Sequence, residues 1–159
     1  MTFTESIKTC LFKKPFVFSG RGSRSEYWWF WLFTFLIEFL LELLHLPDMI
    51  DHIIKLIILL PMIGASIRRL HDSNLSGWFI LLNFFGFIIP LYLFTISVNL
   101  LILSCILLVS INIYLYCRKS TPGRNKYGDV PEDILLASSL SQINNNAQTM
   151  HDDKINLDK

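Results

Sequence analysis

The sequence predicts an all-α membrane protein with four transmembrane helices, both termini in the cytoplasm and a disordered polar C-terminal tail. Three observations support this fold class. Of the 159 residues, 52% are hydrophobic and only 17% are charged, whereas soluble domains carry about 25% charged residues. Several apolar stretches reach the roughly 20 residues that a helix needs to cross a bilayer. Basic residues also alternate between abundance and near-absence in successive connections, as the positive-inside rule requires.

The first two spans are expected over residues 27–46 and 50–67. The first begins with three closely spaced tryptophans, which suit the headgroup interface, and ends before Pro47. Pro61 lies in the middle of the second span, where it removes a backbone hydrogen bond and predicts a kink. The small residues that follow at 64–66 would let a neighbouring helix approach closely.

The last two spans are expected over residues 78–95 and 99–117. The interval from Trp78 to Cys117 contains no charged residue and is about twice as long as one span. Turn-forming residues occur at 86–90 and at 95–99. A break in the second of these ranges divides the interval into two spans of similar length.

Cytoplasmic segments are predicted on both sides of this transmembrane domain (residues 27–117). Residues 1–26 precede it and residues 118–131 follow it. Residues 132–159 hold too little apolar surface to offset the entropy of ordering, so this tail is expected to be largely disordered, apart from a possible short amphipathic helix near its start.

Charge sets the predicted orientation. Five cations precede the first span, two arginines connect the second to the third, and four cations follow the last. The connection between the first two spans carries no Lys or Arg before Lys55. This alternation predicts a multi-pass protein with four helices and both termini in the cytoplasm. The net charge of +1 gives no reason to expect a nucleic-acid partner.

Three polar segments fall on the predicted cytoplasmic side. They read F-S-G-R-G-S-R-S-E-Y-W from Phe18, R-R-L-H-D-S-N-L-S-G-W from Arg68 and P-G-R-N-K-Y-G from Pro122. Their arginines could pair with Glu26 and Asp72, because bidentate pairs between arginine and carboxylate are geometrically specific. The candidate interface residues are Gly20, Arg21, Arg24, Glu26, Tyr27, Trp28, Arg68, Arg69, His71, Asp72, Ser76, Gly77, Trp78, Asn125, Tyr127 and Gly128.

Three interpretations of these segments remain open. The first is a polar clamp that fixes the helix ends through internal pairs. In the second, some arginines stay available for the phosphate of a lipid or small molecule. The third gives His71 a catalytic role, but adjacent residues of a helix point about 100° apart, so Asp72 could not orient the imidazole without unusual geometry.

Together these segments resemble the signature segments of the bacterial membrane family catalogued as domain of unknown function 805. They occur in the family's order and cover most of residues 15–131. The resemblance implies a small inner-membrane protein with several transmembrane helices, and it implies no established activity. The stretch between the second and third segments is longer than the family pattern. The matching positions are the interface residues named above together with Leu70, Pro122, Gly123 and Pro131.

Ionisable residues also occur inside the first span. Glu38, Glu42 and His45 follow spacings of four and three, which place them on one helix face. Such residues within a membrane suggest a proton or cation pathway. Pairing with Lys55 is an alternative, and so is a metal site built with the outer residues Asp48, Asp51 and His52.

No catalytic, cofactor-binding or metal-binding motif is recognised, and the three cysteines are too widely spaced to predict disulfides or a metal site. The preferred hypothesis is a non-enzymatic membrane component that binds anionic lipid headgroups or a partner protein through its cytoplasmic arginine-rich face. The main alternative is a small oligomeric transporter or ion-permeation subunit that uses the Glu38 face. An enzyme acting on lipid through His71 is the third hypothesis. Membrane lipids are the expected partners, with a protein partner or a homo-oligomer as further possibilities.

Overall fold

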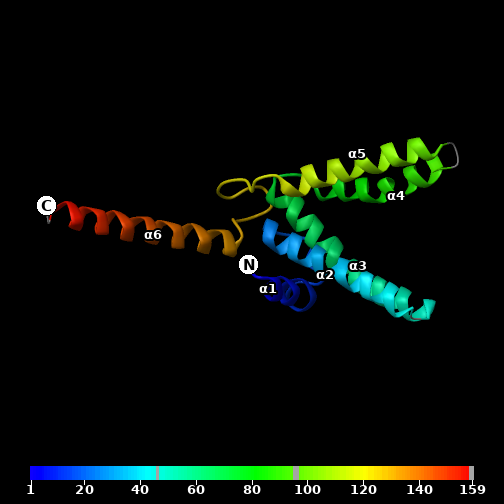
Figure 1. The fold of residues 1–159 in the computed structure, drawn as a ribbon, viewed down its shortest axis with the longest axis horizontal. Helices are drawn as coiled ribbons and strands as arrows, with labels where there is room; N and C mark the ends of the chain where they lie inside the picture. The colour runs from blue at the N-terminus through cyan, green and yellow to red at the C-terminus, as the bar shows by residue number, and fades with distance from the viewer. Residues whose placement is uncertain (46, 95–96, 158–159) are drawn as a thin grey trace.

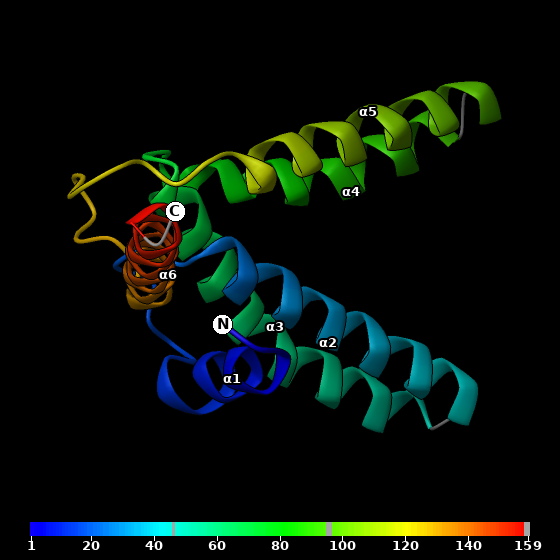
Figure 2. The same cartoon turned by 60° about the vertical axis from the view of Figure 1, so that its left-hand side comes forward.

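Two helical hairpins diverge from a shared polar end in the computed structural model, which describes residues 1–45, 47–94 and 97–157. The first hairpin pairs α2 (Arg24–Leu44) with α3 (Asp48–Asp72), and the second pairs α4 (Leu81–Phe94) with α5 (Val98–Cys117). Figures 1 and 2 show both hairpins leaving the same end of the molecule and separating along their length. We call this shared end, where α2 begins and α3 and α5 end, the base.

Local sequence explains where these helices begin and end. The Ser23 hydroxyl accepts a hydrogen bond from the backbone N–H of Glu26 at 3.1 Å and so caps α2. Ser97 caps α5 in the same way through the N–H of Asn99. His45 ends α2 in the left-handed conformation, with a φ of 45°, and Pro47 directly precedes α3. Capping and helix-ending residues in the sequence therefore set the ends of these helices.

Three of the helices are long and apolar enough to cross a membrane, namely α2, α3 and α5. The helix α4 has only 14 residues and continues from a short 3₁₀ turn, η2 (Gly77–Ile80). The predicted break between the last two spans agrees with the end of α4 at Phe94 and the start of α5 at Val98, whereas residues 86–90 lie inside α4. Residues 46, 95 and 96, on which parts of these predictions fall, lie outside the described residues.

Buried apolar residues gather close to the base. One cluster joins Tyr27, Leu70, Leu115 and Tyr116, and a second joins Cys10, Phe30 and Ala65. Most large apolar side chains farther along the hairpins are exposed. That distribution is expected where lipid, rather than protein, covers the helices.

The N-terminal segment forms a helical element that the sequence analysis did not predict. It consists of α1 (Phe3–Lys8) and the π-helical turn η1 (Thr9–Lys13), and it packs against α2 and α3. A capping box between Thr2 and Glu5 starts α1. Ser6 and Cys10 are fully buried against the hairpin.

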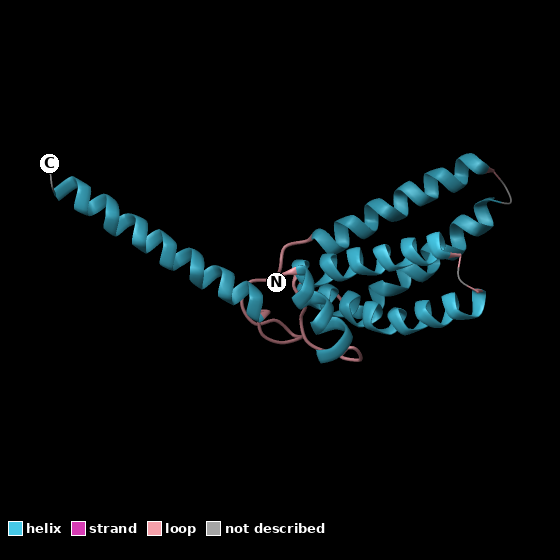
Figure 3. Ribbon diagram, turned by 60° about the horizontal axis from the view of Figure 1, so that its bottom comes forward, coloured by secondary structure: helices cyan, strands magenta, loops and turns pink. Residues whose placement is uncertain are grey.

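The prediction of a largely disordered tail is wrong for the described part of this segment. Residues Glu132–Leu157 form one continuous helix, α6, which projects from the base away from the hairpins (Figure 3). Two acidic residues in its first turn favour the helix by complementing its dipole. The helix also contains no Gly or Pro. α6 includes the short amphipathic helix predicted near the start of this segment and continues to Leu157. Residues 158–159 lie outside the described part of the chain.

Candidate functional site

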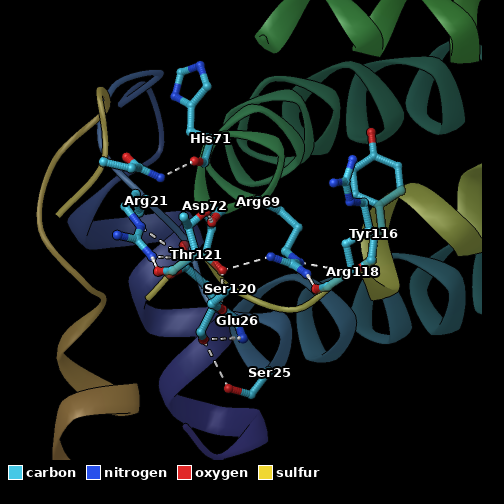
Figure 4. A network of polar contacts seen from close by, with 12 residues as sticks. Arg21, Ser25, Glu26, Arg69, His71, Asp72, Tyr116, Arg118, Ser120 and Thr121 are labelled. Carbon is cyan, nitrogen blue, oxygen red and sulfur yellow. Dashed lines mark hydrogen bonds and ion pairs between the residues drawn. The ribbon is translucent and has the colours of Figure 1, made fainter. Parts of the chain in front are cut away.

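A buried network of charges lies at the base and joins the three polar segments (Figure 4). Asp72, at the end of α3, is its first centre. One carboxylate oxygen faces the Arg21 guanidinium at 2.9 Å, and the other accepts a hydrogen bond from Arg69 at 2.8 Å. The Ser120 hydroxyl also donates to this carboxylate. All three of these charged side chains are fully buried.

Backbone carbonyls complete the surroundings of the two arginines. Arg69 donates to the carbonyls of Tyr116, at 2.9 Å, and of Arg118. These carbonyls lie at the C-terminal end of α5, where the helix dipole favours a cation. Arg21 donates to the carbonyls of Thr121 and Gly123 at 2.6 and 2.5 Å. The network therefore ties the chain that follows α5 to the end of α3.

Glu26, in the first turn of α2, is the second centre of the network. It accepts hydrogen bonds from Nε and Nη2 of Arg68 at 3.0 and 2.7 Å. Arg68 also donates to the carbonyls of Lys14 and Val17. The backbone carbonyl of Glu26 in turn accepts a bond from Ser6 at 2.6 Å. This part of the network fastens the N-terminal segment to both helices of the first hairpin.

Close packing of the chain supports these pairs at two glycines. A side chain at Gly22 would begin 3.1 Å from Cβ of Arg68, and one at Gly64 would begin 3.2 Å from its guanidinium. Separations that short are tighter than ordinary van der Waals contact. The two glycines thus let the segments before α2 reach α3.

The expected pairing occurs for Arg21, Arg68 and Arg69, and it does not occur for Arg24. Every guanidinium nitrogen of the first three arginines has a partner within the chain. Arg24 is exposed and forms no ion pair with a described acidic residue. The polar-clamp interpretation therefore describes the three buried arginines, and any anion at the base must be recognised by other cations.

Most remaining interface residues surround His71. Its Nδ1 lies 3.1 Å from the Gly20 carbonyl, so this nitrogen carries the proton. The imidazole stacks on the Tyr127 ring with centroids 3.7 Å apart, and the Asn125 amide donates to the His71 carbonyl at 2.9 Å. Gly20 and Gly128 adopt positive φ values of 81° and 133°, which glycine tolerates readily.

This geometry does not support a catalytic His71–Asp72 couple. The His71 ring points away from Asp72 in Figure 4, and both oxygens of that carboxylate are engaged by other side chains. A base and its orienting carboxylate must share a hydrogen bond. The stack with Tyr127 instead holds the 118–131 segment against the end of α3.

The other candidate residues border the base. Ser76 caps η2 through the Trp78 N–H, and Trp78 is exposed. Gly77 lies against Ile67 of α3. Tyr27 stacks on Tyr116 with centroids 4.4 Å apart, and Trp28 packs beside them. These aromatic residues lie between the charge network and the apolar part of the hairpins.

The ionisable residues of the first span lie toward the far end of its hairpin. Glu38 lines a cavity of about 320 Å³ between α2 and α3, together with Thr34, His52 and Lys55. The Lys55 ammonium pairs with Asp51 at 2.9 Å. His45 lies beyond the end of α2, so it does not share a helical face with Glu38 and Glu42. Within the described part of the chain, no group of three His, Cys, Asp or Glu residues could hold a metal ion.

Cys10 is a member of the network that the sequence analysis missed. Its thiol lies 3.6 Å from Nη2 of Arg68 and 3.9 Å from the Glu26 carboxylate. Burial is the main cause that raises the pKa of Cys10 to about 12, and the neighbouring Glu26 charge adds to the shift. Ser6, Ser120 and Thr121 were missed as well. No local pattern distinguishes them, because their partners lie 20 to 49 residues away.

Comparison with known proteins shows that the three polar segments lie within a family match. The family model described as "Protein of unknown function (DUF805)" matches residues 15–129, which include all three polar segments. The chain is 33% identical over 120 residues to the inner membrane protein YhaI of Escherichia coli K12, covering 72% of this chain and 86% of YhaI. It is 29% identical over 124 residues to the inner membrane protein YhaH of the same organism, covering 72% and 87%. No solved structure matches the chain.

Proposed function

The chain belongs to the DUF805 family of proteins of unknown function, and from that premise we propose that it is a non-enzymatic membrane component whose base binds anionic lipid headgroups. It is a multi-pass protein of the bacterial inner membrane, as its apolar helices and its relatives indicate. The main observation behind the proposal is that the cations near the base fall into two groups, one buried and paired and the other exposed. Three arginines are consumed by internal pairs, while many other cations around the base remain exposed.

Four spans with both termini in the cytoplasm are the first part of the proposal. The turn η2 and α4 together extend roughly 29 Å, close to the ~30 Å hydrocarbon thickness of a bilayer. Figure 1 draws α4 beside α5 along its length, which supports a full crossing. The positive-inside rule then assigns the base to the cytoplasm, because its segments carry nearly all of the cations.

The exposed cations form the second part of the proposal. At the proposed cytoplasmic surface, each Lys or Arg close to anionic lipid contributes about 1 kcal/mol of attraction. The N-terminal segment adds exposed apolar side chains at Phe12, Phe16 and Phe18 beside Lys13 and Lys14. Basic residues mixed with aromatic ones suit the headgroup boundary. The exposed cations of the base are Lys8, Lys13, Lys14, Arg24, Arg118, Lys119, Arg124 and Lys126.

Topology can be tested by labelling single cysteines in intact cells. Lys126→Cys lies in the 118–131 segment and Met49→Cys lies at the opposite turn, and both positions are exposed. An impermeant maleimide should label Met49→Cys from outside and should reach Lys126→Cys only after the membrane is opened. Labelling of Lys126→Cys in intact cells would overturn the proposed orientation.

Headgroup binding can be tested by the lipids that co-purify with the protein in mild detergent. The wild type should be enriched in phosphatidylglycerol and cardiolipin relative to the source membrane. Replacing Lys13, Lys14, Arg118 and Lys119 with glutamine should lower this enrichment roughly tenfold or more. Lys55→Gln, at the far end of the hairpin, is the control and should have no effect. Wild-type protein without enrichment, or a folded quadruple variant that keeps it, would refute the proposal.

Permeation is the second candidate function, supported by the cavity that Glu38 lines between α2 and α3. Ionisable residues at membrane depth are costly and mark pathways in many transporters. Proteoliposomes loaded with a pH-sensitive dye test this candidate. Proton flux that Glu38→Gln abolishes and Glu42→Gln leaves intact would support it, since Glu42 does not line the cavity. If wild-type protein conducts no protons, the candidate fails.

Self-association is proposed for α6. Five of its exposed apolar residues follow alternating spacings of four and three, the spacing of a coiled-coil seam. Such a narrow stripe matches a second copy of the same helix better than the broad face of a globular partner. Cross-linking through a cysteine at Ile143 should give a dimer, and one at Asn144 should give much less. Equal cross-linking would contradict this seam. The seam consists of Leu136, Leu140, Ile143, Ala147 and Met150.

A further inference from the structure

A large apolar cleft separates the two hairpins beyond the base. Its volume is about 1050 Å³, and its walls come from α2 and α3 on one side and from α4 and α5 on the other. Figure 2 shows the two hairpins diverging as they leave the base. Most of the lining residues are large and apolar, including Trp28, Trp31, Leu59, Ile88, Val109 and Ile113. In a membrane, a space with these walls must be filled by apolar matter.

The size and the apolar lining of the cleft suit a lipid chain. Pockets for small molecules measure about 300–1,000 Å³ and are mostly apolar, with a few polar groups placed at their ends. An acyl chain of a phospholipid is slender and flexible enough to enter such a space.

A cation lies where the headgroup of this lipid would be. Arg24 precedes Trp28 by four residues and Trp31 by seven, so the three share one stripe of α2. Since both tryptophans line the cleft, this stripe places Arg24 one turn closer to the base than Trp28, next to the lining residues rather than among them. Arg24 is exposed, and it lies close enough to the buried Arg69 for the two like charges to repel.

We infer that the cleft binds one phospholipid, with an acyl chain between the hairpins and its phosphate at Arg24. A phosphate suits this position because it would pair with a cation that the charge network leaves without an acidic partner. The inference rests on the proposed function and deepens it. The exposed cations of the base attract anionic headgroups in general, whereas the cleft holds an individual lipid molecule.

Native mass spectrometry of the purified full-length protein tests this site, with phosphatidylglycerol as the probe. After delipidation, wild-type protein should take up one tightly held phosphatidylglycerol. Val109→Trp places a much larger side chain in the wall of the cleft and should weaken this uptake severalfold. Leu107→Trp is the matched control, because Leu107 is as exposed as Val109 (59% and 58%) but does not line the cleft. Arg24→Gln should weaken binding roughly tenfold, and Arg124→Gln should leave it within about twofold.

Two further arms separate the sources of binding. Glycerol phosphate, which has no acyl chain, should not compete with phosphatidylglycerol. Competition would mean that the site recognises the phosphate without the acyl chain, and it would overturn the inference. Cysteines at Val109 that cross-link two copies would identify a second protein as the occupant and overturn the inference. Uptake by Val109→Trp equal to that of Leu107→Trp, with unchanged unfolding temperatures, would also overturn it. Such a result would not affect the enrichment of anionic lipid at the base. The proposed function is therefore tested separately, by the lipids that co-purify with the protein.

Discussion

Asp72 balances more buried charge than Glu26, because two guanidinium groups face its carboxylate and only one faces that of Glu26. Removing one partner of a buried ion pair costs about 3–5 kcal/mol, since the remaining charge is left uncompensated. Asp72→Asn should therefore lower the free energy of unfolding more than Glu26→Gln. Unfolding in mixed detergent micelles, followed by circular dichroism, measures both losses.

A surface carboxylate provides the control for this comparison. Asp129 is 79% exposed and lies 3.7 Å from Arg124, so Asp129→Asn should cost less than about 1 kcal/mol. Equal losses for Asp72→Asn and Glu26→Gln would show that the second guanidinium at Asp72 adds nothing to the free energy of unfolding.

The thiol of Cys10 should be unreactive while the base is intact. Its pKa of about 12 leaves almost no thiolate at pH 8, and the side chain is fully buried. Iodoacetamide should therefore modify the exposed Cys117 and spare Cys10 in detergent-solubilised protein. Arg68→Gln should loosen the N-terminal segment and expose Cys10. Modification of Cys10 and Cys117 at similar rates in the wild type would contradict the burial of this segment.

Single residues could be predicted from the sequence only in part. The polar segments and their two carboxylates stand out against apolar surroundings, which is why the pairing of arginines with Glu26 and Asp72 could be foreseen. Which arginine pairs with which carboxylate depends on how α2, α3 and the end of α5 meet. Backbone carbonyls such as those of Tyr116 and Thr121 leave no trace in sequence.

At the scale of elements, α6 is attached to the rest of the chain mainly at its first turn. The Asp133 carboxylate accepts hydrogen bonds from Ser23 and Ser25 at 2.6 and 2.9 Å. Ending the chain at Val130 should therefore lower the free energy of unfolding by no more than about 2 kcal/mol. Asp133→Asn should account for most of that loss. A much larger effect of the truncation, measured by the same unfolding assay, would reveal further contacts along α6.

Elements were predictable where a long apolar run fixed them. α2, α3 and α5 follow directly from such runs, and α4 ends at Phe94 and α5 begins at Val98, on either side of the break that the sequence indicated. α1 and η1 could not be predicted in this way, because their buried faces consist of small residues such as Ser6 and Cys10 that meet their partners only in the folded base. For α6, a short helix near the start of the segment was predicted, and the continuation of the helix to Leu157 was not.

At the scale of the whole molecule, the described residues join the two hairpins mainly at the base. The charge network and both buried clusters lie close to the base, whereas the cleft separates the hairpins beyond it. Spin labels at Met49 and Asn99, near the two turns, should therefore give a broad distance distribution in detergent. Labels at Lys14 and Lys119, at the base, should give a narrow one. Double electron–electron resonance measures both, and equally narrow distributions would contradict this arrangement.

The cleft itself could not be predicted from sequence. Its walls are made of the same apolar residue types that face lipid elsewhere, so no pattern distinguishes Val109 from Leu107 before the two hairpins are placed. The predicted topology gives the direction in which each helix crosses the membrane. The angle between the two hairpins depends instead on the contacts at the base.

The tie between Asp72 and the chain after α5 also imposes an order on biogenesis. Translation delivers Arg21, Arg69 and Asp72 long before Ser120 and Thr121, so the nascent protein holds two arginines whose carbonyl acceptors do not yet exist. A chain that stops at Cys117 keeps the Tyr116 carbonyl but lacks those of Arg118, Thr121 and Gly123, and membrane proteases should clear it quickly. A chain that stops at Val130 has all four carbonyls and should persist much longer than the Cys117 chain. Equal pulse–chase lifetimes of the two truncated chains would mean that residues 118–130 do not stabilise the protein.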